Sequence, residues 1–490
     1  MSIPTLITFV VYFVFLLGIG AYFYRKSVSI EDYLLGGRGM GAWVTALSAQ
    51  ASDMSGWLLM GLPGAIYLGG IENAWIAIGL FFGTVLNWQL VAGRLRVYTE
   101  KTNTITLPSF FEERFGDPTG LLRTVSAIII LVFFAIYASS GLVAAGKLFE
   151  AVFGINYQLA VIVGGTVIIA YTFLGGFLAV CWTDLFQGSL MVVAIVLVPI
   201  LAYFETGGTE PIRANMAAKG ISTGLIPAGS KFPLLAILSA SAWGLGYFGQ
   251  PHILARFMSA KSLTKLKESM QIAIVWVFMS LSGAVVVGLV GIGMFDNLAG
   301  GDQENVFIYM IDKLFNPWAG GVMLAAILSA IMSTIDSQLL VSSSALAEDF
   351  YQKAIKKNAS QREIIIAGRI CVIIISAVAL FLALRPNDTI LGIVAYAWAG
   401  FGAAFGPLVL FALFSRRTTW HSALAGMVAG TVVLVVFKQV GLGEYLYEIV
   451  PGFLANCSTI MVINRFFQQK DTQILKDYDL VTATIRKLNK

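Results

Sequence analysis

An otherwise apolar segment near the start of the chain is interrupted by groups that could bind an ion. Asp53 lies between the hydroxyls of Ser52 and Ser55, and a glycine follows. An ionised aspartate at the centre of a membrane helix costs about 2.5–3.5 kcal/mol on insertion scales, so it is retained where it has a partner. A neighbouring helix is one such partner. The other is a small hard cation, which prefers carboxylate, hydroxyl and backbone carbonyl oxygens.

A second group of hydroxyls follows a helical stripe further along the chain. Ala330, Ser333, Thr334 and Ser337 are spaced i, i+3, i+4 and i+7, so they share one face of a helix. Two hydroxyls on one turn, with a backbone carbonyl beside the small alanine, can coordinate Na⁺. The alternative is hydrogen bonding of the hydroxyls to their own helix and close packing of small residues.

Two more carboxylates lie in apolar segments. Asp336 adjoins the stripe, and Asp184 follows Thr183 near the start of an expected helix. We interpret Asp184 either as a residue that caps that helix near the cytoplasmic surface, or as part of a second cation site with Asp336 and Ser337.

A glycine-rich segment offers a candidate solute site. Trp243 and Tyr247 are four residues apart and share a helical face, while three glycines and Pro251 make an unbroken helix improbable between 243 and 252. The two rings could form a wall for a small ring-bearing solute or could belong to ordinary packing. Arg256, further on, is interpreted as an orientation anchor or a gate.

The composition indicates that these residues belong to a protein embedded in a membrane. The chain has 490 residues, of which 58% are hydrophobic and 12% charged, against about 25% charged residues in soluble domains. We therefore expect an all-α integral membrane protein with about thirteen transmembrane helices. They are predicted near 3–24, 41–67, 71–95, 121–147, 157–174, 178–204, 231–258, 265–295, 316–347, 363–384, 388–415, 419–439 and 444–466.

The two interrupted segments suggest an internal repeat. They are roughly 190 residues apart, as expected when each begins one of two inverted five-helix repeats. The predicted divisions are an extra helix and first cytoplasmic loop (1–40), the first repeat (41–204), an outer loop (205–230), the second repeat (231–415), two C-terminal helices (416–467) and a cytoplasmic tail (468–490). Most Lys and Arg residues fall in one set of loops, which places the N-terminus outside and the C-terminus in the cytoplasm.

The sequence contains no motif that favours an enzyme or a nucleic-acid-binding protein. No nucleophile–base pair, phosphate loop or metal-ligand cluster favours an enzyme, and Cys181, Cys371 and Cys457 are widely spaced in apolar runs. The net charge of +5 is interpreted as membrane orientation, so we expect no nucleic-acid partner. We also expect no obligate protein partner, only the lipid bilayer.

Five motifs resemble those of the solute:sodium symporter family, and the second and fourth resemble its proline-transporting branch. The motifs are DYLLGGR (32–38), ASDMSGW (51–57), YTFLGGFLAV (171–180), AWGLGYFGQPH (242–252) and MST (332–334). The resemblance covers nearly the whole chain. It implies a leucine-transporter-like core of five plus five helices, in a cytoplasmic membrane, with Na⁺ and L-proline as transported species.

The resemblance also implies roles for individual residues. Na⁺ would be held by the carbonyls of Ala51, Met54 and Ala330 and the hydroxyls of Ser333 and Thr334. Asp53 would support that site from beside it, with Ser55 and Gly56 near both ion and solute. Tyr137, Trp243 and Tyr247 would line the solute pocket. Another solute such as pantothenate, a different amino acid or a sugar stays open, as does a channel or sensor.

Overall fold

The computed structural model describes residues 2–24, 30–174, 176–227, 229–298, 300, 302–356 and 358–488. Gly175 of the third motif lies outside these residues. Within them every regular element is helical, and the one β contact is an isolated bridge between Met40 and Ala260. The all-α expectation is therefore confirmed.

The helices follow one another with short connections. In chain order they are α1 (Ile3–Tyr24), α2 (Ile30–Leu35), α3 (Ala42–Asp53), α4 (Leu62–Gly69), α5 (Ala74–Leu86), α6 (Gly93–Lys101), α7 (Leu107–Phe115), α8 (Leu121–Phe153), α9 (Tyr157–Leu174), α10 (Phe177–Glu205), α11 (Thr209–Ala218), α12 (Pro233–Ser241), α13 (Pro251–Ser259), α14 (Leu263–Met294), α15 (Val306–Leu314), α16 (Pro317–Ser344), α17 (Gln361–Ala383), α18 (Ile390–Phe414), α19 (Trp420–Gln439), α20 (Ile449–Phe466) and α21 (Thr472–Leu488). Short 3₁₀ or π segments adjoin some of them: η1 (Gly36–Arg38), η2 (Trp57–Gly61), η3 (Gly70–Asn73), η4 (Asn87–Ala92), η5 (Ala242–Gly249), η6 (Asp302–Asn305), η7 (Ala345–Ile355) and η8 (Leu442–Glu444).

Ten helical stretches in the described part of the chain are long and apolar enough to cross a membrane. Shorter apolar helices occupy Tyr157–Ala170 and Pro233–Gly249. One of the ten, Trp57–Lys101, contains more than one helix. Helix α4 ends within it at Gly69, and Gly70, with a φ of 73°, turns the chain. The predicted multi-pass membrane architecture is thus confirmed, whereas the count of thirteen spans is not.

The predicted helix at 41–67 is broken in its middle. Helix α3 ends at Asp53, Met54 has non-helical dihedral angles (φ −81°, ψ 78°), and helical structure resumes at Trp57. The Cβ of an alanine at Gly56 would lie 2.7 Å from the Cβ of Ala144 in α8, so the interruption packs tightly against that helix. The expected break in this segment is confirmed.

The predicted helix at 231–258 is also broken. Helix α12 passes into the 3₁₀ segment η5, Gln250 is extended (φ −79°, ψ 107°), and α13 begins at Pro251. Proline disfavours helical geometry in the residue before it, which explains why the extended residue is Gln250. The expected second break is confirmed as well.

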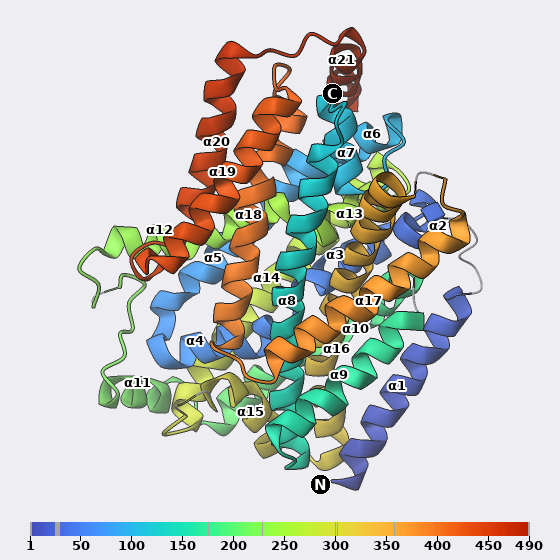
Figure 1. The fold of residues 1–490 in the computed structure, drawn as a ribbon. Coiled ribbons are helices and arrows are strands. Elements are labelled where there is room, and N and C mark those ends of the chain that lie inside the picture. Colours follow the sequence, from blue (N-terminus) through green and yellow to red (C-terminus); the bar gives the residue numbers. More distant parts are fainter. Residues whose placement is uncertain are drawn as a thin grey trace.

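The broken helices lie inside the bundle. Helix α3 packs against α10, α13, α14 and α16, and α8 runs through the middle of the molecule (Figure 1). Helix α16 is buried along most of its length. The start of α1 and the last helix, α21, lie at opposite ends of the molecule (Figure 1).

Two regions that were predicted to lack helices contain one helix each. Helix α11 lies within the expected outer loop, and α21 occupies the expected tail. Helix α21 packs against α6, and its Asp479 accepts hydrogen bonds from both Nε (3.1 Å) and Nη2 (3.0 Å) of Arg416. The tail is therefore docked on the bundle rather than extended into solvent.

Candidate functional site

The break after α3 releases backbone carbonyls from helical hydrogen bonding. In an unbroken helix the amide of Ser55 would bond to the carbonyl of Ala51, but it bonds to that of Asp53 instead (3.0 Å). Likewise, the amide of Leu58 bonds to the carbonyl of Ser55 (3.0 Å) rather than to that of Met54. The carbonyls of Ala51 and Met54 are thus free of their usual helical partners.

The hydroxyl stripe of α16 meets the first of these carbonyls. Ser333 Oγ donates to the Ala51 carbonyl at 2.7 Å, and Thr334 Oγ1 lies 3.3 Å from the same oxygen. Thr334 Oγ1 also lies 3.2 Å from the carbonyl of Ala330. Two hydroxyl and two carbonyl oxygens therefore meet between α3 and α16, and hydroxyl protons can rotate away to present lone pairs to a cation.

Asp53 lies beside this oxygen cluster and bonds in another direction. Its Oδ2 accepts a 2.5 Å hydrogen bond from the hydroxyl of Tyr247 in η5. Its carbonyl accepts from Trp57 Nε1 (3.0 Å) and from the Tyr137 hydroxyl (3.3 Å). Asp53 is fully buried. The residue thus connects the first break, the second break and α8.

Two of the three expected solute residues meet at Asp53, and the third lies near them. Tyr137 and Tyr247 both bond to Asp53. Trp243 lies one turn before Tyr247, and its ring centroid is 6.3 Å from that of Trp57. The backbone segments that interrupt the two helices are therefore covered by aromatic side chains.

Ser55 and Gly56 form the turn itself. Ser55 Oγ accepts a 3.4 Å hydrogen bond from the amide of Trp57, two residues on, and so helps to close the turn. Gly56 lies against α8 with no room for a side chain. Both residues lie within two positions of Met54, beside the freed carbonyls.

Sequence reasoning missed the aromatic residues that complete this wall. Tyr447 stacks on Trp243 with ring centroids 5.4 Å apart, and Trp398 Nε1 donates to the Trp243 carbonyl (2.7 Å). Trp398 also meets Tyr247 edge to face at 5.0 Å. Both residues are about 150 or more positions away in the chain, where no local pattern links them to η5.

A cavity of about 600 Å³ leads to Trp243 from one side. Its lining includes Trp243 and Tyr447, together with the charged residues Lys231, Lys438 and Glu448. The stacked residues Trp243 and Tyr447 both line it, whereas Tyr247 and Asp53 do not.

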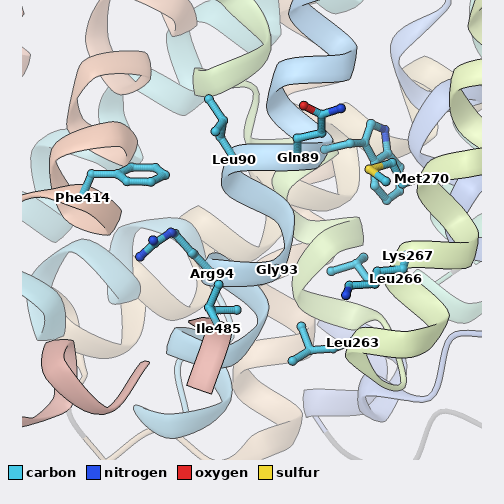
Figure 2. A pocket seen from close by; sticks show the side chains of 11 residues that line it. Gln89, Leu90, Gly93, Arg94, Leu263, Leu266, Lys267, Met270, Phe414 and Ile485 are labelled. Carbon is cyan, nitrogen blue, oxygen red and sulfur yellow. The ribbon is translucent and has the colours of Figure 1, made fainter. Parts of the chain in front are cut away.

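A second cavity, of about 340 Å³, has no part in this site. It lies between η4, α6, α14, the end of α18 and α21, and Figure 2 shows Arg94, Lys267, Phe414 and Ile485 around it. None of the expected ion or solute residues lines it.

The expected second cation site contains a residue that the prediction did not include. Asp184 and Ser337 do approach each other, but the guanidinium of Arg256 lies between them, 3.4 Å and 2.5 Å away respectively. Asp336 accepts a hydrogen bond from Thr172. The interpretation of Asp184 as a helix cap is wrong, because α10 begins at Phe177 after Gly176 and Asp184 is fully buried.

Known proteins resemble this chain in sequence over nearly its whole length. The model of the sodium:solute symporter family matches residues 33–430. The sodium/proline symporter of Salmonella typhimurium is 50% identical over 470 residues, covering 94% of this chain and 93% of that protein. The high-affinity proline transporter PutP of Bacillus subtilis is 47% identical over 466 residues, covering 94% and 98%.

Solved structures share the fold at much lower identity. A Na⁺-coupled sialic acid symporter in a substrate-bound outward-open state matches with a TM-score of 0.81 and 18% identity, over 96% of this chain and 100% of that chain. MhsT in complex with L-phenylalanine matches with a TM-score of 0.56 and 13% identity, over 87% and 98%. These likenesses confirm the leucine-transporter-like fold class.

Proposed function

Because the chain belongs to the sodium:solute symporter family, we propose that it couples inward movement of Na⁺ to uptake of L-proline by alternating access. The observation that carries the proposal is the contact of Ser333 and Thr334 with the freed carbonyl of Ala51. The names of relatives with 47–50% identity supply the solute. The cytoplasmic membrane, with the N-terminus outside, is part of the same proposal.

The proposed Na⁺ site consists of the carbonyls of Ala51, Met54 and Ala330 and the hydroxyls of Ser333 and Thr334. All are oxygen ligands of the kind that hard cations prefer. An ion there would attract α3 and α16 from both sides and so hold the first half of the broken helix in place. One charge moved through 100 mV releases about 2.3 kcal/mol, which can drive accumulation of a net-neutral zwitterion.

The proposed solute site lies on the other side of the break, among Tyr137, Trp243 and Tyr247. Asp53, Ser55 and Gly56 adjoin both sites. Asp53 is the last residue of α3, and its side chain accepts a hydrogen bond from Tyr247. A shift of α3 therefore moves the hydrogen-bond partner of Tyr247 in the proposed solute site. Ion and solute then raise each other's affinity by the same factor.

The two broken helices would begin equivalent halves of the transporter. The first repeat, 41–204, starts with α3 and the second, 231–415, contains η5 near its start. Binding sites between discontinuous helices of two repeats are the usual arrangement in such transporters. The Asp53–Tyr247 hydrogen bond joins the proposed repeats at their interruptions.

Uptake of labelled proline by vesicles containing the purified protein tests the proposal. We expect saturable uptake driven by a Na⁺ gradient and lost when K⁺ replaces Na⁺. A panel of unlabelled pantothenate, other amino acids and sugars tests the solute, and only proline should compete strongly. Equilibrium proline binding that is independent of Na⁺ would contradict the coupling.

A further inference from the structure

Arg256 of α13 is fully buried, and its guanidinium contacts three other helices. Its Nη2 lies 3.4 Å from Asp184 Oδ2 in α10 and 2.5 Å from Ser337 Oγ in α16. Its Nε donates to Ser48 Oγ in α3 (3.1 Å). Its Nη1 donates to the carbonyl of His252 in its own helix (3.0 Å). Arg256, Asp184, Ser48 and Ser337 have no exposed surface.

The groups around this guanidinium form a cation-binding set. A carboxylate, two hydroxyls and a backbone carbonyl surround it, which are the oxygen types that also coordinate metal cations. Ser48 Oγ donates to the same oxygen of Asp184 that faces Arg256 (2.7 Å), so the set is connected. Asp184 and Ser337, two residues of the predicted second cation site, thus surround a protein side chain that already carries a positive charge.

A free cation cannot share this position with Arg256. Two like charges so close together in a buried site repel each other strongly. Conversely, a buried carboxylate that loses its only cation is strongly destabilised. No other described Lys, Arg or His lies within 4 Å of Asp184. Asp184 thus depends on Arg256 for its charge balance.

Further carboxyl oxygens lie close by without a hydrogen-bond partner. Asp184 Oδ1 and Asp336 Oδ2 are both buried, and neither has a partner among the described residues. Asp336 adjoins Ser337 in α16 and accepts a hydrogen bond from Thr172. Removal of the guanidinium would leave the Asp184 carboxyl group and the hydroxyls of Ser48 and Ser337 around the space that it fills.

We propose that Arg256 is a built-in cation that takes the place of a second transported ion, so that the protein carries a single Na⁺ with each solute. This inference rests on the proposed Na⁺-coupled function. It assigns the Asp184–Ser337 pair to a fixed charge and leaves the Ala51–Ser333–Thr334 cluster as the one exchangeable Na⁺ site. Arg256 is then the residue that sets the ion stoichiometry.

The number of ²²Na⁺ ions bound by the purified full-length protein in detergent tests this directly. The parent should bind one ion per molecule, and binding of two would overturn the inference. Arg256→Ala should bind two, while Arg256→Ala combined with Asp184→Asn should return to one. Arg416→Ala, which removes an exposed arginine, is the matched control and should bind one.

Free guanidinium ion provides a second test, and by replacing the missing side chain it can also stabilise an Arg256→Ala protein that folds poorly. Added at millimolar concentration during purification of Arg256→Ala, it should refill the space and displace the second ²²Na⁺ but not the first. An Arg256→Ala protein that binds one ²²Na⁺ both with and without guanidinium would overturn the inference.

Arg256→Lys keeps a positive charge and should bind one ion. If Arg256→Ala cannot be purified even with guanidinium, Arg256→Lys and the more conservative Arg256→Gln decide the question. Binding of one ion by Lys and two by Gln supports the inference, and equal numbers contradict it. A parent that binds no ²²Na⁺ would instead contradict the proposed function, so the two failures are distinguishable.

Discussion

The hydroxyl of Tyr247 donates a 2.5 Å hydrogen bond to the carboxyl group of Asp53, and this bond joins the interruptions of two broken helices. Asp53 is the last helical residue of α3, and Tyr247 lies in η5. Both residues are buried, so water does not replace the bond if one partner is removed. The bond therefore offers a direct route by which the proposed ion site can influence the proposed solute site.

Tyr247→Phe should weaken proline binding by leaving Asp53 Oδ2 buried without its donor. An unsatisfied buried group costs about 1–3 kcal/mol, and to the extent that this cost falls on the solute-binding arrangement, the affinity falls by up to about 150-fold. Equilibrium binding of labelled proline measures it. In Asp53→Asn combined with Tyr247→Phe the losses should be less than additive, because both substitutions break one bond. Strict additivity would separate the two residues functionally.

Ser333→Ala should raise the Na⁺ concentration for half-maximal uptake by about tenfold or more, equivalent to 1.4 kcal/mol of lost ion binding. The substitution removes one proposed oxygen ligand without changing the backbone. Ser329→Ala is the matched control, because it deletes a buried hydroxyl one turn away that bonds to Ala325 and Tyr12. An unchanged Na⁺ requirement in Ser333→Ala would exclude its hydroxyl as a ligand.

Gly56→Ala should impair both ion and solute binding by displacing the turn. Its Cβ would lie 2.7 Å from the Cβ of Ala144, and overpacking of this kind costs about 1–3 kcal/mol. Combining it with Ala144→Gly should restore much of the uptake, since the second change removes the obstructing atom. Gly18→Ala, in α1 where nothing lies within 4 Å, should leave uptake unchanged. Failure of Ala144→Gly to rescue would contradict the steric explanation.

The docking of α21 should respond to acid through Asp479. Hydrogen bonding to Arg416 lowers the pKa of Asp479 below its ordinary value, and the same contact raises the pKa of Arg416. A carboxyl group with a lowered pKa stabilises the docked state above its unfolded pKa, and this contribution disappears as the pH falls through the lowered value.

Hydrogen exchange of α21 measures this effect. Protection should be constant near neutral pH and fall only below about pH 4, the ordinary range of aspartate. It should also fall in high salt, because the pair is exposed. Asp479→Asn should show weaker protection at pH 7, and Lys476→Gln, on the same helix, should not. Equal protection in parent and Asp479→Asn would remove the pair from docking.

The sequence by itself determined the membrane class and the positions of both helix breaks. Local chemistry suffices for these features: long apolar runs have one stable environment, and Gly56, the glycines of η5 and Pro251 disfavour continuous helix wherever the chain folds. The stripe of Ser333 and Thr334 was equally readable, because helical spacing places them on one face.

Only the tertiary structure decided which of these groups meet. The Ala51 carbonyl reaches Ser333, Asp53 bonds to Tyr247 rather than to the hydroxyl stripe, and Tyr447 covers Trp243. The sequence suggested Arg256 as an anchor or gate, and only the structure shows that its guanidinium contacts both Asp184 and Ser337. Spacing along one helix specifies a face, but partners on helices far apart in sequence depend on how the whole bundle packs, and that is set by the summed burial of all its helices.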